Sequence, residues 1–247
     1  MNIKNSLAFA AIGVFALQFP ANASAQSTLG MFGKFEKGSM SVALDDAFPV
    51  ECLWAAYYGI EQYNNYFTST NNFRLYYGGT VADHPPSMST SWRPDYIDVL
   101  NSAVAGYTYK GYTYSTSTLG FANHVYKAGT ENTSNPILID GQVYENASYF
   151  YYGTGTPGAY DFDCDRADGT TGIDYQSHVM HEIGHVIGLK HTPGTSTYSN
   201  CMMTPIISSG TRPDWCSIEG YTLGVAYGNT DDSGLVYASP LSGAETQ

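Results

Sequence analysis

Apolar residues recur at helical spacing in several stretches of the chain. The stretches 173–188 and 213–227 each predict a helix, and Pro213 suits the first turn of the second one. A short helix is also predicted at 94–105. The clearest pattern, at 48–66, predicts a long first helix whose apolar face carries Leu53, Ala56, Tyr57, Ile60 and Tyr63.

Strands are predicted where aromatic and β-branched residues replace the helical pattern. Residues 73–77 predict one strand, 107–127 predict several strands joined by glycine turns, and 136–140 predict a buried strand. The segment 79–93 is rich in Pro, Ser and Thr, and 153–172 is rich in Gly and Asp. Both segments predict loops, so helices and strands are mixed along the chain.

The first 25 residues have the pattern of a secretory signal peptide. Lys4 supplies a positive start, residues 6–19 are largely apolar, and residues 23–25 match an A-x-A cleavage site after which the mature chain would start at Gln26. The apolar core is short for a membrane span, and no later run of about 18 apolar residues follows it. We therefore expect a soluble, secreted, extracellular protein with no membrane association after cleavage.

The composition is that of an acidic globular protein. The 247 residues are 43% hydrophobic and 13% charged, and the formal net charge is −12. Because like charges repel, this charge disfavours nucleic acid and anionic membranes as partners. It does not specify a substrate.

The most informative stretch is 181–191, which follows the pattern H-E-x-x-H-x-x-G-x-x-H. His181 and His185 are four residues apart, so a helix places both imidazoles on one face, where they can bind one metal ion. Zn²⁺ binds imidazole readily. Glu182 would lie beside the metal, where a carboxylate can take a proton from a zinc-activated water.

The third histidine of the pattern can bind the same ion only if the helix ends before it. In a continuous helix His191 would lie about 240° around the axis from His185 and roughly 9 Å along it. Gly188 allows the helix to end, since glycine adopts left-handed conformations. Three protein ligands leave one zinc position open, as in catalytic sites. His178, three residues before the first ligand, would close that position if it bound, and otherwise lies beside the site or at the surface.

These residues resemble the signature of the metzincin metalloproteases, and a matrixin-like form of it. The metzincin signature includes a Met-turn downstream, and residues 201–205 (C-M-M-T-P) are similar to its matrixin form. Residues 173–177 and 226–228 are also similar to matrixin domains. The resemblance implies an α+β, metzincin-like fold: a twisted mixed β-sheet with a long first helix, an active-site helix and a C-terminal helix. It also implies that Met203 forms a hydrophobic floor under the histidines.

The resemblance implies a function and a domain organisation. The function is that of a secreted zinc-dependent endopeptidase with protein or peptide substrates and Glu182 as general base. The alternative is a secreted, non-catalytic binding or adhesion protein that contains zinc. The segment 26–41 would be an N-terminal arm or short pro-segment, 42–228 the metzincin-like catalytic domain, and 229–247 a flexible tail.

A substrate-binding strand also follows from the resemblance. Residues 118–122 are similar to the matrixin edge strand that pairs with an extended substrate, which assigns this role to Gly120, Phe121 and Ala122. Substrate binding would then occur by strand addition, with main-chain hydrogen bonds to the open edge.

Four cysteines in a secreted chain predict two disulfides, for which three connectivities are open. We favour Cys201 with Cys216, which would tie the Met-turn to the last helix. Cys52 would then pair with Cys164 and join the first helix to the loop before the active-site helix.

One acidic loop is a candidate for a second metal. Asp161, Asp163, Asp165 and Asp168 form an oxygen-rich cluster that could hold Ca²⁺. The match to a calcium loop is partial, because Arg166 stands where the loop glycine belongs and no Glu closes the loop. A solvated acidic loop is therefore the default interpretation.

Overall fold

The computed structural model describes residues 28–67, 71–82, 93, 95–109, 112–150, 158, 161–165, 171–228 and 236–237. The predicted signal peptide at 1–25 and most of the tail at 229–247 lie outside these residues. Within the described part of the chain, no helix is both long enough and apolar enough to cross a membrane.

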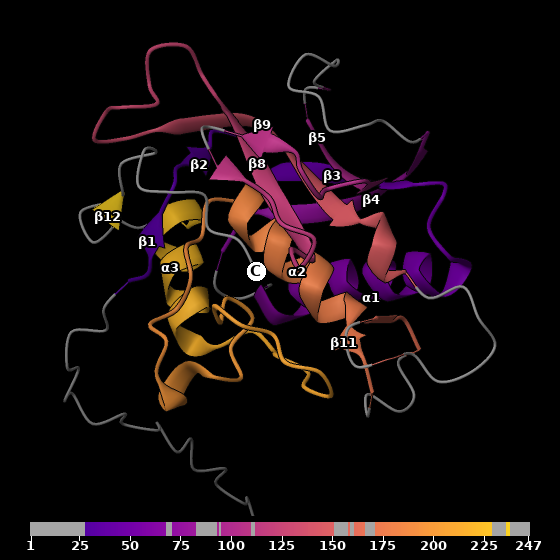
Figure 1. The fold of residues 1–247 in the computed structure, drawn as a ribbon. Helices are drawn as coiled ribbons and strands as arrows, with labels where there is room; N and C mark the ends of the chain where they lie inside the picture. Colours follow the sequence, from indigo (N-terminus) through magenta and orange to yellow (C-terminus); the bar gives the residue numbers. More distant parts are fainter. Residues whose placement is uncertain are drawn as a thin grey trace, which may run out of the picture.

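The core of the fold is one twisted sheet of six strands (Figure 1). Five strands are parallel to their neighbours, in the order β2 (Lys34–Phe35), β9 (Ile137–Asn146), β5 (Tyr96–Ser102), β3 (Ser39–Asp45) and β4 (Arg74–Val81). The sixth strand, β8 (Gly120–Tyr126), pairs with β9 in the antiparallel sense. The mixed sheet confirms the predicted fold class.

Three short two-stranded ladders surround this sheet. Their strands are β1 (Gly30–Met31) with β12 (Val236–Tyr237), β10 (Phe162–Asp163) with β11 (Ile173–Asp174), and β6 (Thr108–Tyr109) with β7 (Tyr112–Thr113). Because β1 pairs with β12, the two ends of the described chain meet.

Helices cover the sheet, and the predicted first helix, active-site helix and C-terminal helix are all present. The α-helices are α1 (Val50–Phe67), α2 (Tyr175–Val186) and α3 (Ser217–Tyr227), and the short 3₁₀ helices are η1 (Ala147–Tyr149) and η2 (Ser196–Tyr198). Helix α2 packs against α1 and against the β8–β9 pair, and it lies near the centre of the molecule in Figure 1. The contact with α1 is close, since a Cβ on Gly59 would lie 2.5 Å from Cγ of Met180. All twelve residues of α2 are buried.

The prediction of a helix at 94–105 is wrong, because this segment contains strand β5. The strand lies between β3 and β9, so both of its edges are paired. Ile97 and Val99 join the main core, whereas Leu100 joins a second apolar cluster with Phe121 and Tyr144. The buried residues of this strand also include the polar Asp98, Asn101 and Ser102, so apolar and polar residues do not alternate regularly along it. Without a regular alternation, a short buried strand cannot be distinguished from a short buried helix by its sequence pattern.

The segment at 26–41, which we expected to be an arm or short pro-segment, contributes to the packed fold from its first described residues. Leu29, Met31 and Phe35 are almost fully buried. The amide of Phe32 donates to the Gly188 carbonyl at 2.7 Å, and the amide of Lys190 donates to the Gly30 carbonyl at 3.0 Å. This segment therefore lies directly against the residues that follow α2.

Candidate metal centre and active site

Helix α2 presents His181, Glu182 and His185, and it is fixed at its beginning by a polar cap. Oδ2 of Asp174 accepts a hydrogen bond from the Ser177 amide at 2.9 Å, as an N-cap residue does. The other carboxylate oxygen of Asp174 lies 2.9 Å from Nε of Arg212. The start of the helix is therefore anchored to the segment that precedes α3.

The helix ends where the sequence predicts that it should. Gly188 has φ of +106°, and the Leu189 amide donates to the Gly184 carbonyl at 3.0 Å. A Cβ on Gly188 would lie 2.0 Å from the carbonyl oxygen of Gly33. Both the backbone conformation and the close approach of another segment therefore require glycine here.

The turn at Gly188 brings the third histidine back to the helix. Nε2 of His191 lies 3.2 Å from Nε2 of His181 and 3.2 Å from Nε2 of His185. Two nitrogens bound at about 2.0–2.1 Å to a tetrahedral Zn²⁺ would lie roughly 3.3 Å apart. Within the described part of the chain, this is the one group of three or more His, Cys, Asp or Glu side chains that could hold a metal ion.

Backbone carbonyls orient two of the three imidazoles. Nδ1 of His181 lies 2.7 Å from the Met202 carbonyl oxygen, and Nδ1 of His185 lies 2.8 Å from that of Leu189. In both rings Nδ1 then donates, so Nε2 presents its lone pair to the centre of the cluster. Burial, together with the neighbouring histidines, holds the pKa of His181 and of His185 well below its usual range. Neutral imidazoles with converging lone pairs fit a cation.

Glu182 lies on the same helix with both carboxylate oxygens buried. Neither oxygen has a hydrogen-bond partner among the described residues. Burial raises the pKa of Glu182 to about 8, against a lowering influence of His178 and with a further raising influence of Glu145. A carboxyl group with a pKa near neutrality and unused oxygen atoms is suited to accept and return a proton.

His178 does not join the metal cluster. Its Nδ1 lies 2.9 Å from Oε2 of Glu145, and its Nε2 lies 3.9 Å from Oε1 of Glu182. Burial lowers the pKa of His178, but the Glu145 carboxylate more than offsets this effect, so the pKa is raised overall. The interpretation of His178 as a fourth ligand therefore has no support in this geometry.

The predicted Met-turn lies beneath α2. A Cβ on Gly184 would lie 2.4 Å from Sδ of Met203, so the methionine packs against the helix between the second and first histidines. The Thr192 amide donates to the Met203 carbonyl at 2.7 Å, which links the turn to the residue after His191. This contact with α2 is compatible with the predicted hydrophobic floor under the histidines.

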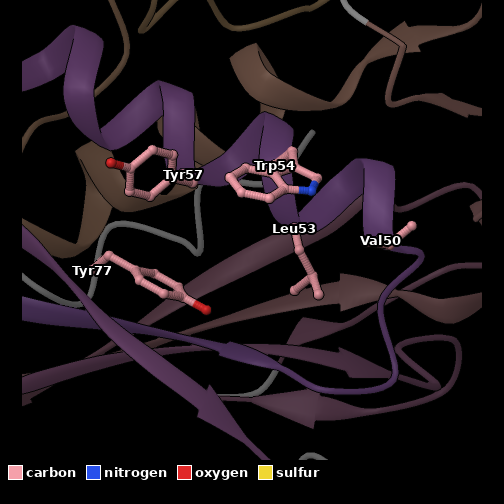
Figure 2. A pocket seen from close by; sticks show the side chains of 5 residues that line it. All are labelled: Val50, Leu53, Trp54, Tyr57 and Tyr77. Carbon is pink, nitrogen blue, oxygen red and sulfur yellow. The ribbon is translucent and has the colours of Figure 1, made fainter.

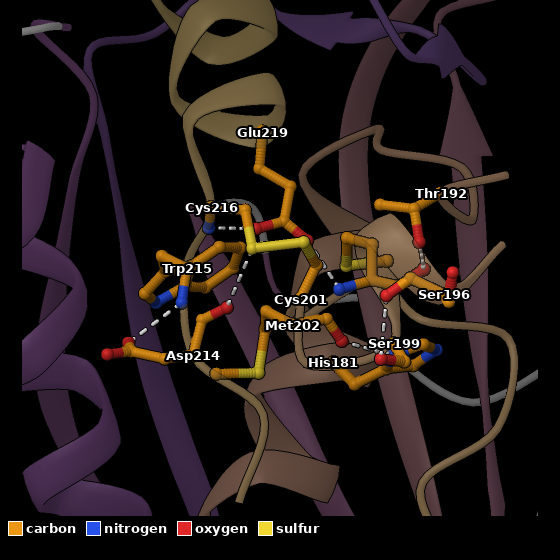
Figure 3. Close-up of a disulfide and its surroundings, with 11 residues drawn as sticks. His181, Thr192, Ser196, Ser199, Cys201, Met202, Asp214, Trp215, Cys216 and Glu219 are labelled. Carbon is orange, nitrogen blue, oxygen red and sulfur yellow. Dashed lines mark hydrogen bonds between the residues drawn. A yellow bond between two sulfur atoms is a disulfide. The ribbon is translucent and has the colours of Figure 1, made fainter. Parts of the chain in front are cut away.

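A buried glutamate that the sequence analysis missed fixes this turn. Oε1 of Glu219 accepts a hydrogen bond from the Met203 amide at 2.5 Å. Oε2 of Glu219 accepts a hydrogen bond from the Cys216 amide at 2.6 Å (Figure 3). Burial raises the pKa of Glu219 to about 7, although the hydrogen bonds from Cys216 and Met203 lower it. A glutamate three residues after a helix N-cap is a recognisable capping signal, but that signal does not reveal the contact with Met203.

The two disulfides have the connectivity that we favoured. Cys201 is bonded to Cys216, and Cys52 is bonded to Cys164. The first bridge joins the Met-turn to the start of α3 (Figure 3). The second bridge joins α1 to the loop that precedes α2.

The predicted substrate strand forms part of β8. Gly120 pairs with Glu145, Phe121 with Tyr144, and Ala122 with Val143, all on β9. Among the described strands β9 is the one neighbour of β8, so its other edge carries no strand there. Phe121 is fully buried in the second apolar cluster and cannot contact a substrate with its side chain.

Calcium binding at the acidic loop is not supported. Asp168 lies outside the described residues. The carboxylates of Asp161 and Asp163 accept hydrogen bonds from the backbone amides of Gly158 and Asp165, at 2.8 and 3.0 Å. Among residues that the structure describes, these aspartates form no metal-sized cluster.

A separate hollow lies on the surface between α1 and β4 (Figure 2). Its volume is about 410 Å³, and its lining is Val50, Leu53, Trp54, Tyr57 and Tyr77. Leu53 and Tyr57, predicted on the apolar face of the first helix, are only half-buried there. None of these residues belongs to the histidine cluster.

Comparison with known families agrees with this geometry. Residues 116–217 match the family model described as Matrixin, a family of peptidases. No curated protein matches the sequence. The matched segment contains the three histidines, Glu182 and the Met-turn, and the family implies a zinc metallopeptidase that acts on proteins or peptides. Residues 116–217 are thus similar to a matrixin, and this likeness supports a matrixin-like metzincin.

Proposed function

We propose that this protein is a secreted zinc-dependent endopeptidase in which His181, His185 and His191 bind the metal and Glu182 is the general base. The observation that carries the proposal is the convergence of three Nε2 atoms, 3.2 Å apart in two of the pairs, beside a buried carboxylate without hydrogen-bond partners among the described residues. Bound zinc would supply a Lewis acid that polarises the scissile carbonyl and lowers the pKa of the attacking water.

Glu182 would carry the proton through the reaction. Its carboxylate takes a proton from the attacking water and then gives it to the leaving nitrogen of the peptide bond. The imidazoles of His181 and His185 keep their orientation throughout, because backbone carbonyls hold their Nδ1 atoms. Met203 and Glu219 keep the floor of the site in place from below.

Substrate binding would use the open edge of β8. A peptide in extended conformation would add to Gly120, Phe121 and Ala122 through main-chain hydrogen bonds. Gly120, the first residue of β8, packs against α2, since a Cβ added to it would lie 2.8 Å from Cε1 of His178. The scissile bond would thus be presented to the face of the helix that carries Glu182.

Secretion and the domain boundaries are parts of the same proposal. The signal peptide at 1–25 would direct export, and two disulfides suit an oxidising compartment. The catalytic domain would include the segment at 28–41, because its apolar side chains are buried in the core. Removal of this segment as a pro-peptide would expose the underlying residues after α2.

The decisive experiment measures zinc content and hydrolysis together. Glu182→Ala should keep one zinc per chain and lose cleavage of a casein-type substrate, and chelation of wild-type protein should abolish the same activity. Glu61→Ala, which removes an exposed carboxylate on α1, is the matched control and should behave as wild type. Wild-type cleavage by Glu182→Ala would refute the mechanism. A zinc-loaded wild-type protein without chelator-sensitive cleavage would favour the non-catalytic alternative.

A further inference from the structure

Behind the general base lies a buried pair of titratable side chains that the reaction described above does not use. Glu145 on β9 and His178 on α2 are both fully inaccessible to solvent, and Oε2 of Glu145 lies 2.9 Å from Nδ1 of His178. The other nitrogen of the same ring, Nε2, lies 3.9 Å from Oε1 of Glu182. One imidazole therefore stands between two carboxylates, one of which is the proposed base.

Residues of two other elements pack closely against this imidazole. Gly120 on β8 is opposite Glu145, and a Cβ there would lie 2.8 Å from Cε1 of His178 and 2.9 Å from Oε2 of Glu145. The Phe162 ring also packs against it, with its centroid 5.0 Å from that of the imidazole. The ring thus has little freedom to turn away from the two carboxylates.

Stability alone does not account for this pair. Removing two charged groups from water is costly, and apolar side chains of similar volume are often at least as stabilising as a buried ion pair. Neither oxygen of Glu145 has a hydrogen bond of good geometry among the described residues, so the pair lacks the supporting bonds that would offset this cost. Its location next to Glu182 supplies the missing reason.

We propose that Glu145 and His178 position Glu182, with Glu145 fixing the imidazole and Nε2 of His178 fixing the carboxylate of the base. His178 is one helical turn before Glu182, so both side chains lie on the same face of α2. The 3.9 Å separation shortens to a hydrogen bond when substrate is bound, as separations in free active sites often do. This inference rests on the proposed function, because it assigns His178 a role through Glu182.

The test compares three variants of the full chain. His178→Phe keeps a ring in the cavity and removes both nitrogens, and His178→Gln restores one donor. We expect kcat to fall about ten- to hundredfold for His178→Phe, while KM and zinc content stay unchanged. A loss of this size is typical when a residue that orients the groups of a metal site, without binding the metal, is replaced. His178→Gln should recover part of the lost kcat. Val179→Ala, which opens a cavity at the next buried position of α2, should lower the urea midpoint while kcat is retained.

A second measurement on the zinc-free protein tests the pair itself. His178→Phe leaves the Glu145 carboxylate buried without its partner, so the urea midpoint should fall. The double variant Glu145→Leu/His178→Phe removes both groups and should recover most of that loss. A recovery in stability without a recovery in kcat would separate the positioning role from a structural one and support the proposal.

The outcomes distinguish this inference from the proposed function. If Glu182→Ala is inactive while His178→Phe keeps wild-type kcat, the positioning role is refuted and the proposed function stands. Loss of zinc by His178→Phe, or a kcat that returns fully in the double variant, also overturns the positioning role. If Glu182→Ala cleaves like wild type, the proposed function fails and this inference fails with it.

Discussion

Replacement of Gly188 by alanine is the sharpest test of how the chain assembles its metal site. This residue ends α2, and the turn that it makes returns His191 to the other two histidines. Its φ of +106° lies in a region that side chains with a Cβ rarely adopt. The added Cβ would also meet the Gly33 carbonyl oxygen at 2.0 Å and Cε of Met31 at 3.0 Å.

The expected loss can be worked from these contacts. Holding a residue other than glycine in such a conformation costs about 1–3 kcal/mol. To relieve the clash with the Gly33 carbonyl, the segment that contains Gly33 must move away from the turn at Gly188. This movement breaks the 2.7 Å hydrogen bond from the Phe32 amide to the Gly188 carbonyl, which costs about another 1 kcal/mol. We therefore expect Gly188→Ala to lose roughly 2–4 kcal/mol of unfolding free energy. With a urea m-value of about 2 kcal/mol/M, the midpoint would fall by about 1–2 M.

The same displacement should reach the metal site. His191 follows the turn by three residues, so its Nε2 would move out of the 3.2 Å contacts that define the cluster. Zinc affinity, measured by competition with a chelator, should fall on the order of tenfold or more.

Gly194→Ala is the matched control for this substitution. Its added Cβ would meet only Cγ of Pro205 at 3.6 Å, an ordinary contact. The control should keep both the urea midpoint and the zinc affinity of the wild type. If Gly188→Ala has the same urea midpoint and zinc affinity as Gly194→Ala, the reasoning about this turn is wrong.

Two further predictions concern the supports of the site. Removal of each disulfide in turn should have different effects on the free energy of unfolding and on zinc affinity. Cys52 and Cys164 are 112 residues apart, so their loss should cost about 5 kcal/mol, against about 3 kcal/mol for Cys201 and Cys216, which are 15 apart. Zinc affinity should fall more for the second pair, and equal effects of the two pairs on urea midpoint and zinc affinity would contradict this assignment. For Asp140, burial raises the folded-state pKa to about 7, so the wild type loses stability as pH rises from about 4 through 7. Asp140→Asn should therefore gain in urea midpoint relative to wild type between pH 5 and pH 8, and a constant difference would exclude this titration.

The local part of the site could be predicted from the sequence. His181 and His185 follow helical spacing, and Gly188 marks the end of the helix, so the ligand set depends on residues within eleven positions of one another. The dihedral preferences of single residues and the geometry of one helix are enough to bring these side chains together. The Met-turn could be named only by resemblance, because no local rule places Met203 beneath Gly184.

The supports of the site come from distant parts of the chain, and no spacing rule identifies them. Glu145 reaches His178 through the pairing of β9 in the sheet, 33 positions away along the sequence. Phe32 lies next to His185 only because its segment bonds to the residues after α2, and the two ring centroids are 6.1 Å apart. Strand β5 was missed for a related reason, since its polar and apolar residues are both buried by neighbouring elements, and their order does not show a period of two.

The buried polar groups at this site follow one pattern. Met202 and Leu189 fix His181 and His185 by their carbonyls, and Glu219 fixes the Met-turn by accepting from the backbone. Each of these bonds joins a side chain to main chain, so it sets a direction that packing alone would leave free. Glu182 differs, because among the described residues neither of its carboxylate oxygens has a hydrogen bond, and Nε2 of His178 lies 3.9 Å from Oε1. A base that must accept and release a proton cannot be held by a permanent donor, and a partner 3.9 Å away limits its motion while leaving its oxygen atoms available.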